Sequence, residues 1–143
     1  MFVGEYLHSV DSKGRVALPA RFREELQAGS IITRGNDGCL TIFKSDEWDE
    51  LVEKLSNLPQ SKAEVRSYTR LVLSGAAEIK LDRQGRINLP NYLVNFAGIG
   101  KKVVFVGVNN RLELWDEKKW IEYKEQMEMQ TSEMLEQLGE FGL

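Results

Sequence analysis

The sequence has 143 residues with a formal net charge of −3, and 42% of its residues are aliphatic or aromatic. This composition is typical of a globular protein with a buried core. No apolar run approaches the roughly 20 residues that span a bilayer, and no signal-peptide pattern is visible, so we expect a cytoplasmic protein without a membrane partner. The single cysteine, Cys39, excludes a disulfide within the chain.

The charge is unevenly distributed along the chain. Residues 61–90 carry six lysines and arginines against three acidic residues, whereas residues 116–143 carry three lysines against eight acidic residues. Most of the negative charge therefore belongs to the last helix, which leaves room for a basic surface elsewhere. Charge alone does not favour a nucleic-acid partner.

A tandem repeat is the strongest feature of the sequence. Residues 11–19 and 82–90 share the pattern D-x-x-G-R-[VI]-x-L-P, with five identities in nine positions at an offset of 71. A one-residue slip then changes the offset to 72, at which Gly35 matches Gly107, Leu40 matches Leu112, Phe43 matches Trp115 and Trp48 matches Trp120. Chance explains such a series poorly, so the chain contains two copies of one unit of about 50 residues.

Both copies predict the same series of elements: a strand, a tight turn, a short strand, a short helix, a second hairpin and a closing helix. In the first copy these span residues 5–10, 11–14, 15–18, 20–26, 31–34 with 39–43, and a helix that contains Trp48. In the second copy they span residues 78–81, 82–85, 86–89, 91–97, 103–106 with 112–115, and a helix that contains Trp120.

The reasons lie in local chemistry. Alternating apolar residues favour half-buried strands. An aspartate followed three residues later by a glycine is typical of a type I turn, because the carboxylate binds the backbone ahead and glycine accepts a left-handed conformation. Pro19 and Pro90 end the short strands and open the helices. Asn36-Asp37-Gly38 and Asn109-Asn110 suit the second hairpin turns.

A connecting helix is expected between the copies. Ser61 and Glu64 have the spacing of a capping box, and Gly75 is expected to end the helix. The predicted organisation is a first repeat over 1–56, the connecting helix over 57–75, a second repeat over 76–128, and the end or tail of the C-terminal helix over 129–143. One copy alone would bury little core, so both repeats should form one compact unit. The predicted fold class is α+β, mostly β: a pseudo-twofold barrel built by both repeats, with flanking helices.

The chain resembles the MraZ family over almost its whole length. The resemblance rests on the opening Met1-Phe2-Val3-Gly4-Glu5-Tyr6, on both D-x-x-G-R motifs, on Thr33-Arg34-Gly35 and on Ser74-Gly75-Ala76. It implies an AbrB-like swapped-hairpin barrel and a ring-shaped homo-oligomer. It also implies a nucleoid-associated regulator that binds direct repeats of double-stranded promoter DNA and represses its own division and cell-wall gene cluster.

The same resemblance assigns DNA contact to Arg15 and Arg86. A guanidinium fork can bond O6 and N7 of one guanine or two phosphate oxygens, and a stiff hairpin would present it to a groove. Lys13 and Arg83, in the turns, are expected to add phosphate contacts. Turn-forming support is expected from Asp11, Gly14, Asp82 and Gly85. The alternative is that each arginine only pairs with the aspartate of its own hairpin, which would stabilise the chain very little.

Other residue types point to no catalytic or metal chemistry. His8 has no second histidine to join it, and Cys39 has no histidine partner, so we expect neither a metal site nor a nucleophile. Trp48 and Trp120 are expected to be packing residues and not platforms on which bases stack. Arg66 and Arg70, one helical turn apart, are expected on a solvated face or in a subunit contact.

These expectations describe a protein that is not an enzyme and that uses no cofactor and no small-molecule substrate. One alternative function stays open. The chain would then be an oligomeric scaffold that recruits a protein partner through its acidic C-terminal helix.

Overall fold

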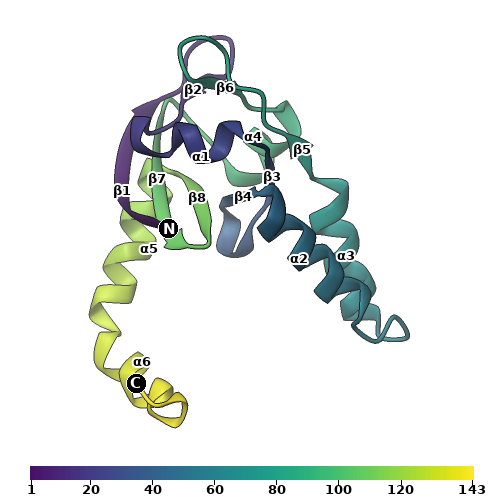
Figure 1. Cartoon of the computed structure of the whole chain (residues 1–143). Coiled ribbons are helices and arrows are strands. Elements are labelled where there is room, and N and C mark those ends of the chain that lie inside the picture. Colours follow the sequence, from purple (N-terminus) through teal and green to yellow (C-terminus); the bar gives the residue numbers. More distant parts are fainter.

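The computed structural model describes residues 1–143, and Figure 1 shows its elements. The first repeat contains β1 (Phe2–Ser9), β2 (Arg15–Ala17), η1 (Ala20–Phe22), α1 (Arg23–Gln27), β3 (Ser30–Arg34), η2 (Asn36–Gly38), β4 (Leu40–Lys44) and α2 (Ser45–Ser56). Helix α3 (Ala63–Ser74) connects the repeats. The second repeat contains β5 (Ala77–Glu78), β6 (Arg86–Asn88), α4 (Asn91–Ala97), β7 (Lys102–Asn109), β8 (Arg111–Asp116) and α5 (Glu117–Met129), and α6 (Thr131–Leu138) and η3 (Gly139–Phe141) end the chain.

The strands of the two repeats interleave. The larger sheet has the order β1-β7-β8-β4-β3-β5, and a second sheet consists of β2 and β6. Strand β1 pairs with β7, and its counterpart β5 pairs with β3, the counterpart of β7. Strands β4 and β8 pair with each other, as do β2 and β6. Exchanging the two repeats reproduces the whole pairing scheme, which is the pseudo-twofold relation that the duplication predicts.

The larger sheet is open, so it does not close into the predicted barrel, and with six α-helices the fold is mixed α and β instead of mostly β. Its outer strands, β1 and β5, do not pair with each other. Strand β5 covers only Ala77 and Glu78 instead of the expected 78–81, so it offers little edge for another strand to pair with. The amide of Ile79 still donates to the carbonyl of Ser30 over 3.0 Å, but the chain then leaves the sheet toward the Asp82 turn.

The core lies between these interleaved strands and is built by both repeats. Sixteen buried residues form one cluster that runs from Phe2 in β1 to Leu114 in β8. Helices α1 and α4 add Leu26 and Leu93, both fully buried. A fully buried leucine contributes about 1.5–3 kcal/mol relative to an exposed one, so neither repeat would keep this stabilisation without the other.

Each repeat ends in an aromatic pair, as the sequence match predicts. The ring centroids of Phe43 and Trp48 are 6.0 Å apart, and those of their counterparts Trp115 and Trp120 are 5.4 Å apart. Trp120 also joins a small buried cluster with Cys39 and Val104. Trp120 is therefore a packing residue, as expected, whereas Trp48 packs on Phe43 and stays half-buried.

The connecting helix ends at Gly75, as expected, but its predicted capping box is wrong. The N-cap is Lys62, and no side chain caps the helix. A capping box needs Ser61 itself at the N-cap and Glu64 at the third helical position, and the helix begins one residue too late for that. Instead, Nη1 of Arg66 donates to the carbonyls of Gln60 (3.1 Å) and Ser61 (3.0 Å).

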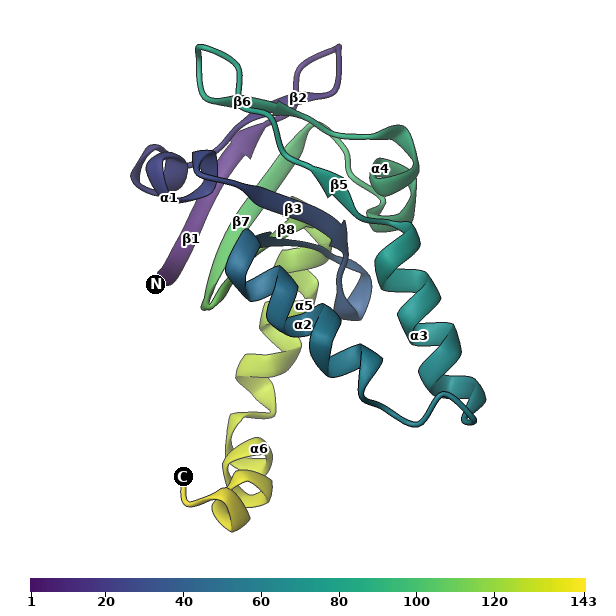
Figure 2. The same ribbon diagram turned by 45° about the vertical axis from the view of Figure 1, so that its right-hand side comes forward.

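Beyond the second repeat, α5 runs away from the sheet and α6 lies at the far end of the molecule (Figures 1 and 2). The side chain of Asp116 caps α5 by accepting from the amide of Lys119. Residues 131–143 are all exposed. None of the helices combines the length and apolar character that crossing a bilayer requires.

Candidate nucleic-acid interface

The first hairpin loop is held by Asp11. Its Oδ1 accepts from the amides of Lys13 and Arg15, both over 2.9 Å. Its Oδ2 accepts from Nε of Arg15 over 2.8 Å. The amide of Gly14 donates to the Asp11 carbonyl over 3.1 Å, and Gly14 has φ +77°, a conformation that glycine adopts without strain. One carboxylate thus fixes both the turn and the direction of the arginine.

The second loop repeats this arrangement. Oδ1 of Asp82 accepts from the amides of Gln84 (2.8 Å) and Arg86 (2.9 Å), and Oδ2 accepts from Nε of Arg86 over 2.8 Å. Gly85 has φ +75°. The expected supporting residues of both loops therefore lie where the turn signature placed them, and the arginine–aspartate pair of each hairpin is present.

The two loops are also joined to each other. Arg15 and Asn88 face each other in the register of β2 and β6. The amide of Leu18 donates to the carbonyl of Gly85 (3.0 Å), and the amide of Leu89 donates to that of Gly14 (2.9 Å). Both loops consequently protrude side by side from the same end of the molecule (Figures 1 and 2).

Both guanidinium groups keep free donors. The Arg15 and Arg86 side chains are 33% and 27% exposed, so they are neither buried nor fully solvated. Only Nε of each is hydrogen-bonded, which leaves the paired Nη edge without a hydrogen bond inside the chain. Lys13 and Arg83 are exposed in the same two loops. The protruding end therefore presents cations with planar donor forks held by a short β-ribbon.

The aspartates stay ionised over a wide pH range. Hydrogen bonds from the backbone amide of Arg15, together with its side chain, lower the pKa of Asp11 below its ordinary value. The amide of Arg86 acts on Asp82 in the same way and lowers its pKa. A carboxylate that accepts several N–H bonds is stabilised in its charged form.

Arg23 is a residue of this end that the sequence reasoning missed. Its Nε donates to the carbonyl of Leu18 over 2.9 Å, and its guanidinium lies against Gly85. Its counterpart in the second repeat is Val94, which packs against the core. Because Arg23 has no equivalent in the other copy, the repeat comparison that identified Arg15 and Arg86 passes over it.

The remaining candidates lie away from such chemistry. The His8 ring packs edge-on against Phe105, and burial and then the charge of Arg23 lower the pKa of His8. Cys39 is fully buried, and burial raises the pKa of its thiol to about 12. The guanidinium of Arg66 binds loop carbonyls, and Arg70 is exposed on α3, which lies away from the hairpin loops in Figure 2.

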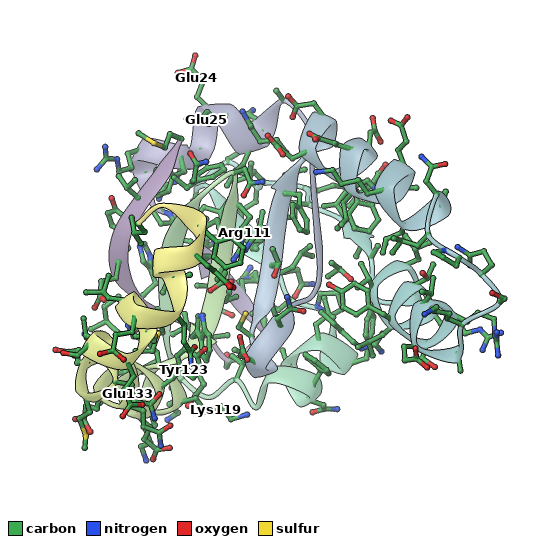
Figure 3. All side chains as sticks on the ribbon, turned by 90° about the horizontal axis from the view of Figure 1, so that it is seen from below. Glu24, Glu25, Arg111, Lys119, Tyr123 and Glu133 are labelled. Carbon is green, nitrogen blue, oxygen red and sulfur yellow. The ribbon has the colours of Figure 1, made fainter.

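The acidic C-terminal helices lie at the opposite end from the loops. Figure 3 views the molecule from that end and shows Glu133 on the projecting α6. Residues 125–143 contain five glutamates and no lysine or arginine. The negative charge of the chain is thus kept away from the arginine loops, which accounts for a net acidic protein with a cationic end.

The sequence matches the MraZ protein family twice, over residues 1–71 and 72–140. Three relatives, each called Transcriptional regulator MraZ, match over the full length of both chains. They come from Natranaerobius thermophilus (44% identity), Syntrophomonas wolfei subsp. wolfei (45%) and Caldanaerobacter subterraneus subsp. tengcongensis (43%). Each of the two family matches contains one of the two interleaved repeats, and the chain belongs to the MraZ family.

Proposed function

We propose that this protein is a sequence-specific DNA-binding transcriptional regulator and that the two hairpin loops are its DNA-contacting surface. The observation that carries the proposal is the paired geometry of Arg15 and Arg86. Each is fixed by an aspartate through Nε, neither donates an Nη hydrogen bond within the chain, and both lie at one protruding end. The printed name of the relatives, transcriptional regulator, supports the same conclusion.

The mechanism follows from the geometry of arginine. A β-ribbon fits the major groove of DNA. An arginine already held by an aspartate loses little side-chain entropy on binding, and its free Nη edge can donate to O6 and N7 of one guanine. Such a contact discriminates between bases by about 1–3 kcal/mol. Lys13 and Arg83 add phosphate contacts that increase affinity without reading sequence.

One pair of loops gives limited specificity, and repetition supplies the rest. We propose that the chain forms a ring-shaped homo-oligomer, so that successive subunits meet direct repeats in the promoter of its own division and cell-wall gene cluster and repress it. Linking several weak contacts raises the overall affinity through effective concentration. The pairing of β2 with β6 across the two repeats supports the AbrB-like swapped-hairpin arrangement for each subunit.

The test is DNA binding by full-length protein to the fragment upstream of its own gene, measured at several salt concentrations. Arg15→Ala and Arg86→Ala should each weaken specific binding, and the double variant should bind this fragment no better than a scrambled one. Arg111→Ala is a matched control, because Nε of Arg111 lies 3.2 Å from Oε2 of Glu113 and this pair is far from the loops. Unchanged affinity and salt dependence in all hairpin variants would exclude these loops as the reading surface.

A scaffold role is a second candidate, and the surface of α6 favours it. Leu135 and Phe141 are 50% and 77% exposed, and they accompany several glutamates at the C-terminal end. Removing residues 131–143 should leave DNA affinity per subunit unchanged if the loops act alone. If the scaffold role is the main one, the same truncation should abolish regulation in cells.

A further inference from the structure

The two loops are not equivalent, and the difference lies on one side of the second loop. A methyl group added at Gly85 would lie 2.6 Å from Cζ and 2.7 Å from Cδ of Arg23. At Gly14 the nearest atoms would be Oδ1 of Asn88 at 3.6 Å and the carbonyl oxygen of Leu89 at 3.7 Å. The Arg23 side chain therefore covers the second turn, and no residue covers the first in this way.

Arg23 carries a positive charge that nothing in the chain neutralises. It belongs to no ion pair, and its only hydrogen bond is from Nε to the carbonyl of Leu18. Its side chain is half-buried. A partly desolvated cation without a counter-ion costs free energy unless a partner supplies negative charge.

The position of this cation identifies the partner. Gly85 belongs to the same loop as Arg83 and Arg86, so Arg23 adjoins the surface that the proposed function assigns to DNA. We propose that Arg23 is a third DNA-contacting arginine, which binds backbone phosphate beside the second hairpin. This inference rests on the proposed function, because it places Arg23 at the edge of the same interface.

The Arg23 side chain contacts both repeats and still leaves donors for a phosphate. Nε anchors the guanidinium to Leu18 in the first repeat, while Cζ and Cδ of the same side chain lie against Gly85 in the second. The Nη groups make no hydrogen bond in the chain and remain available to phosphate oxygens. A guanidinium held at two points loses little further freedom when it binds a phosphate, which lowers the entropic cost of the contact.

The experiment compares Arg23→Gln and Arg23→Lys with wild type in full-length protein. The probes are the fragment upstream of its own gene and a scrambled fragment of equal length. The salt slope is the slope of log affinity against log salt concentration. Arg23→Gln should reduce it on both probes by about one counter-ion per subunit and weaken binding roughly threefold to tenfold. Arg23→Lys, which keeps the charge, should restore the slope. Arg21→Gln is the matched control, since the Arg21 guanidinium lies nearby but donates to the Tyr6 hydroxyl (2.9 Å).

Hydrogen exchange of the variants without DNA distinguishes a loss of loop structure from the loss of a DNA contact. Arg23→Gln should speed the exchange of amides in residues 82–86 and leave residues 11–15 unchanged. A salt slope that is the same in Arg23→Gln and wild type would overturn the inference, while the proposed function would stand if Arg15→Ala and Arg86→Ala still weakened specific binding. A loss of slope that Arg23→Lys does not restore would also overturn it, because the role would then be one of shape alone.

Discussion

Nη1 of Arg86 lies 3.8 Å from Oδ2 of Asp11, so the aspartate of the first loop faces the arginines of both loops. The same oxygen accepts from Nε of Arg15 over 2.8 Å. No reciprocal pair joins Arg15 to Asp82. The two hairpins are thus coupled in one direction through a single carboxylate, and this asymmetry can be tested.

Asp11→Asn should reduce DNA specificity more than Asp82→Asn. The asparagine keeps an oxygen for the turn amides but loses the charge that holds the arginines, and at Asp11 both arginines are affected. The measurement is the ratio of affinities for the upstream fragment and a scrambled one. Non-specific binding should not fall in either variant, since each loses a negative charge near phosphate. Equal effects of the two substitutions would show that the Asp11–Arg86 contact has no consequence for binding.

The loops should keep their order down to low pH. The pKa values of Asp11 and Asp82 are lowered in the folded chain, chiefly by the amides of Arg15 and Arg86. Their stabilising effect is therefore complete above the unfolded value, roughly pH 4, and is lost as the pH falls through the lower folded values. Amide chemical shifts of Lys13 and Gln84, followed by NMR, should titrate with midpoints below that of an unfolded peptide. Midpoints at or above the peptide value would contradict the hydrogen-bonding scheme.

Gly107→Ala should destabilise the whole chain. In the register of β1 and β7, Gly107 faces Gly4, and an added methyl group would collide with the backbone of Phe2 and Val3. Backbone cannot move aside as a flexible side chain can, so we expect a loss of about 1–3 kcal/mol in unfolding free energy. Urea denaturation measures it. Gly139→Ala is the control, because nothing lies within 4 Å of that position.

Cys39 should be inert in the folded protein. Its side chain is fully buried, and its pKa of about 12 leaves almost no thiolate at neutral pH. Iodoacetamide at pH 8 should label native protein far more slowly than protein in guanidinium chloride. Rapid labelling of the native chain would show that the cluster around Cys39 and Trp115 opens readily.

The sequence predicts local features of this fold much better than its long-range pairing. Turns at Asp11 and Asp82 follow from short-range chemistry, and the structure has both. The repeat also led correctly to a pseudo-twofold unit. Which strands of the two repeats pair depends on contacts between residues 45 to 107 positions apart, and periodicity carries no information on that. The shortness of β5, which covers only Ala77 and Glu78, could not be predicted either, because the length of a strand depends on the strand it pairs with.

At the candidate site, too, local features could be predicted from the sequence and long-range contacts could not. Arg15 and Arg86 stand out because the motif occurs twice. Arg23 lies outside the motif and contacts Gly85, some 60 residues away along the chain. Its position beside the loop could therefore be found only in the structure. At the connecting helix, a shift of one residue in the start was enough to make the Ser61 and Glu64 prediction wrong.

Joining the two repeats in one peptide has a consequence for how such a surface evolves. A symmetric homodimer of single repeats would dissociate on dilution and would have to carry the same loop twice. Here the interleaved sheet persists at any concentration, and each copy mutates independently. The two repeats differ at matching positions: Lys13 corresponds to Gln84, and Arg23 corresponds to Val94. The halves thus share one architecture while the residues of their loops have diverged.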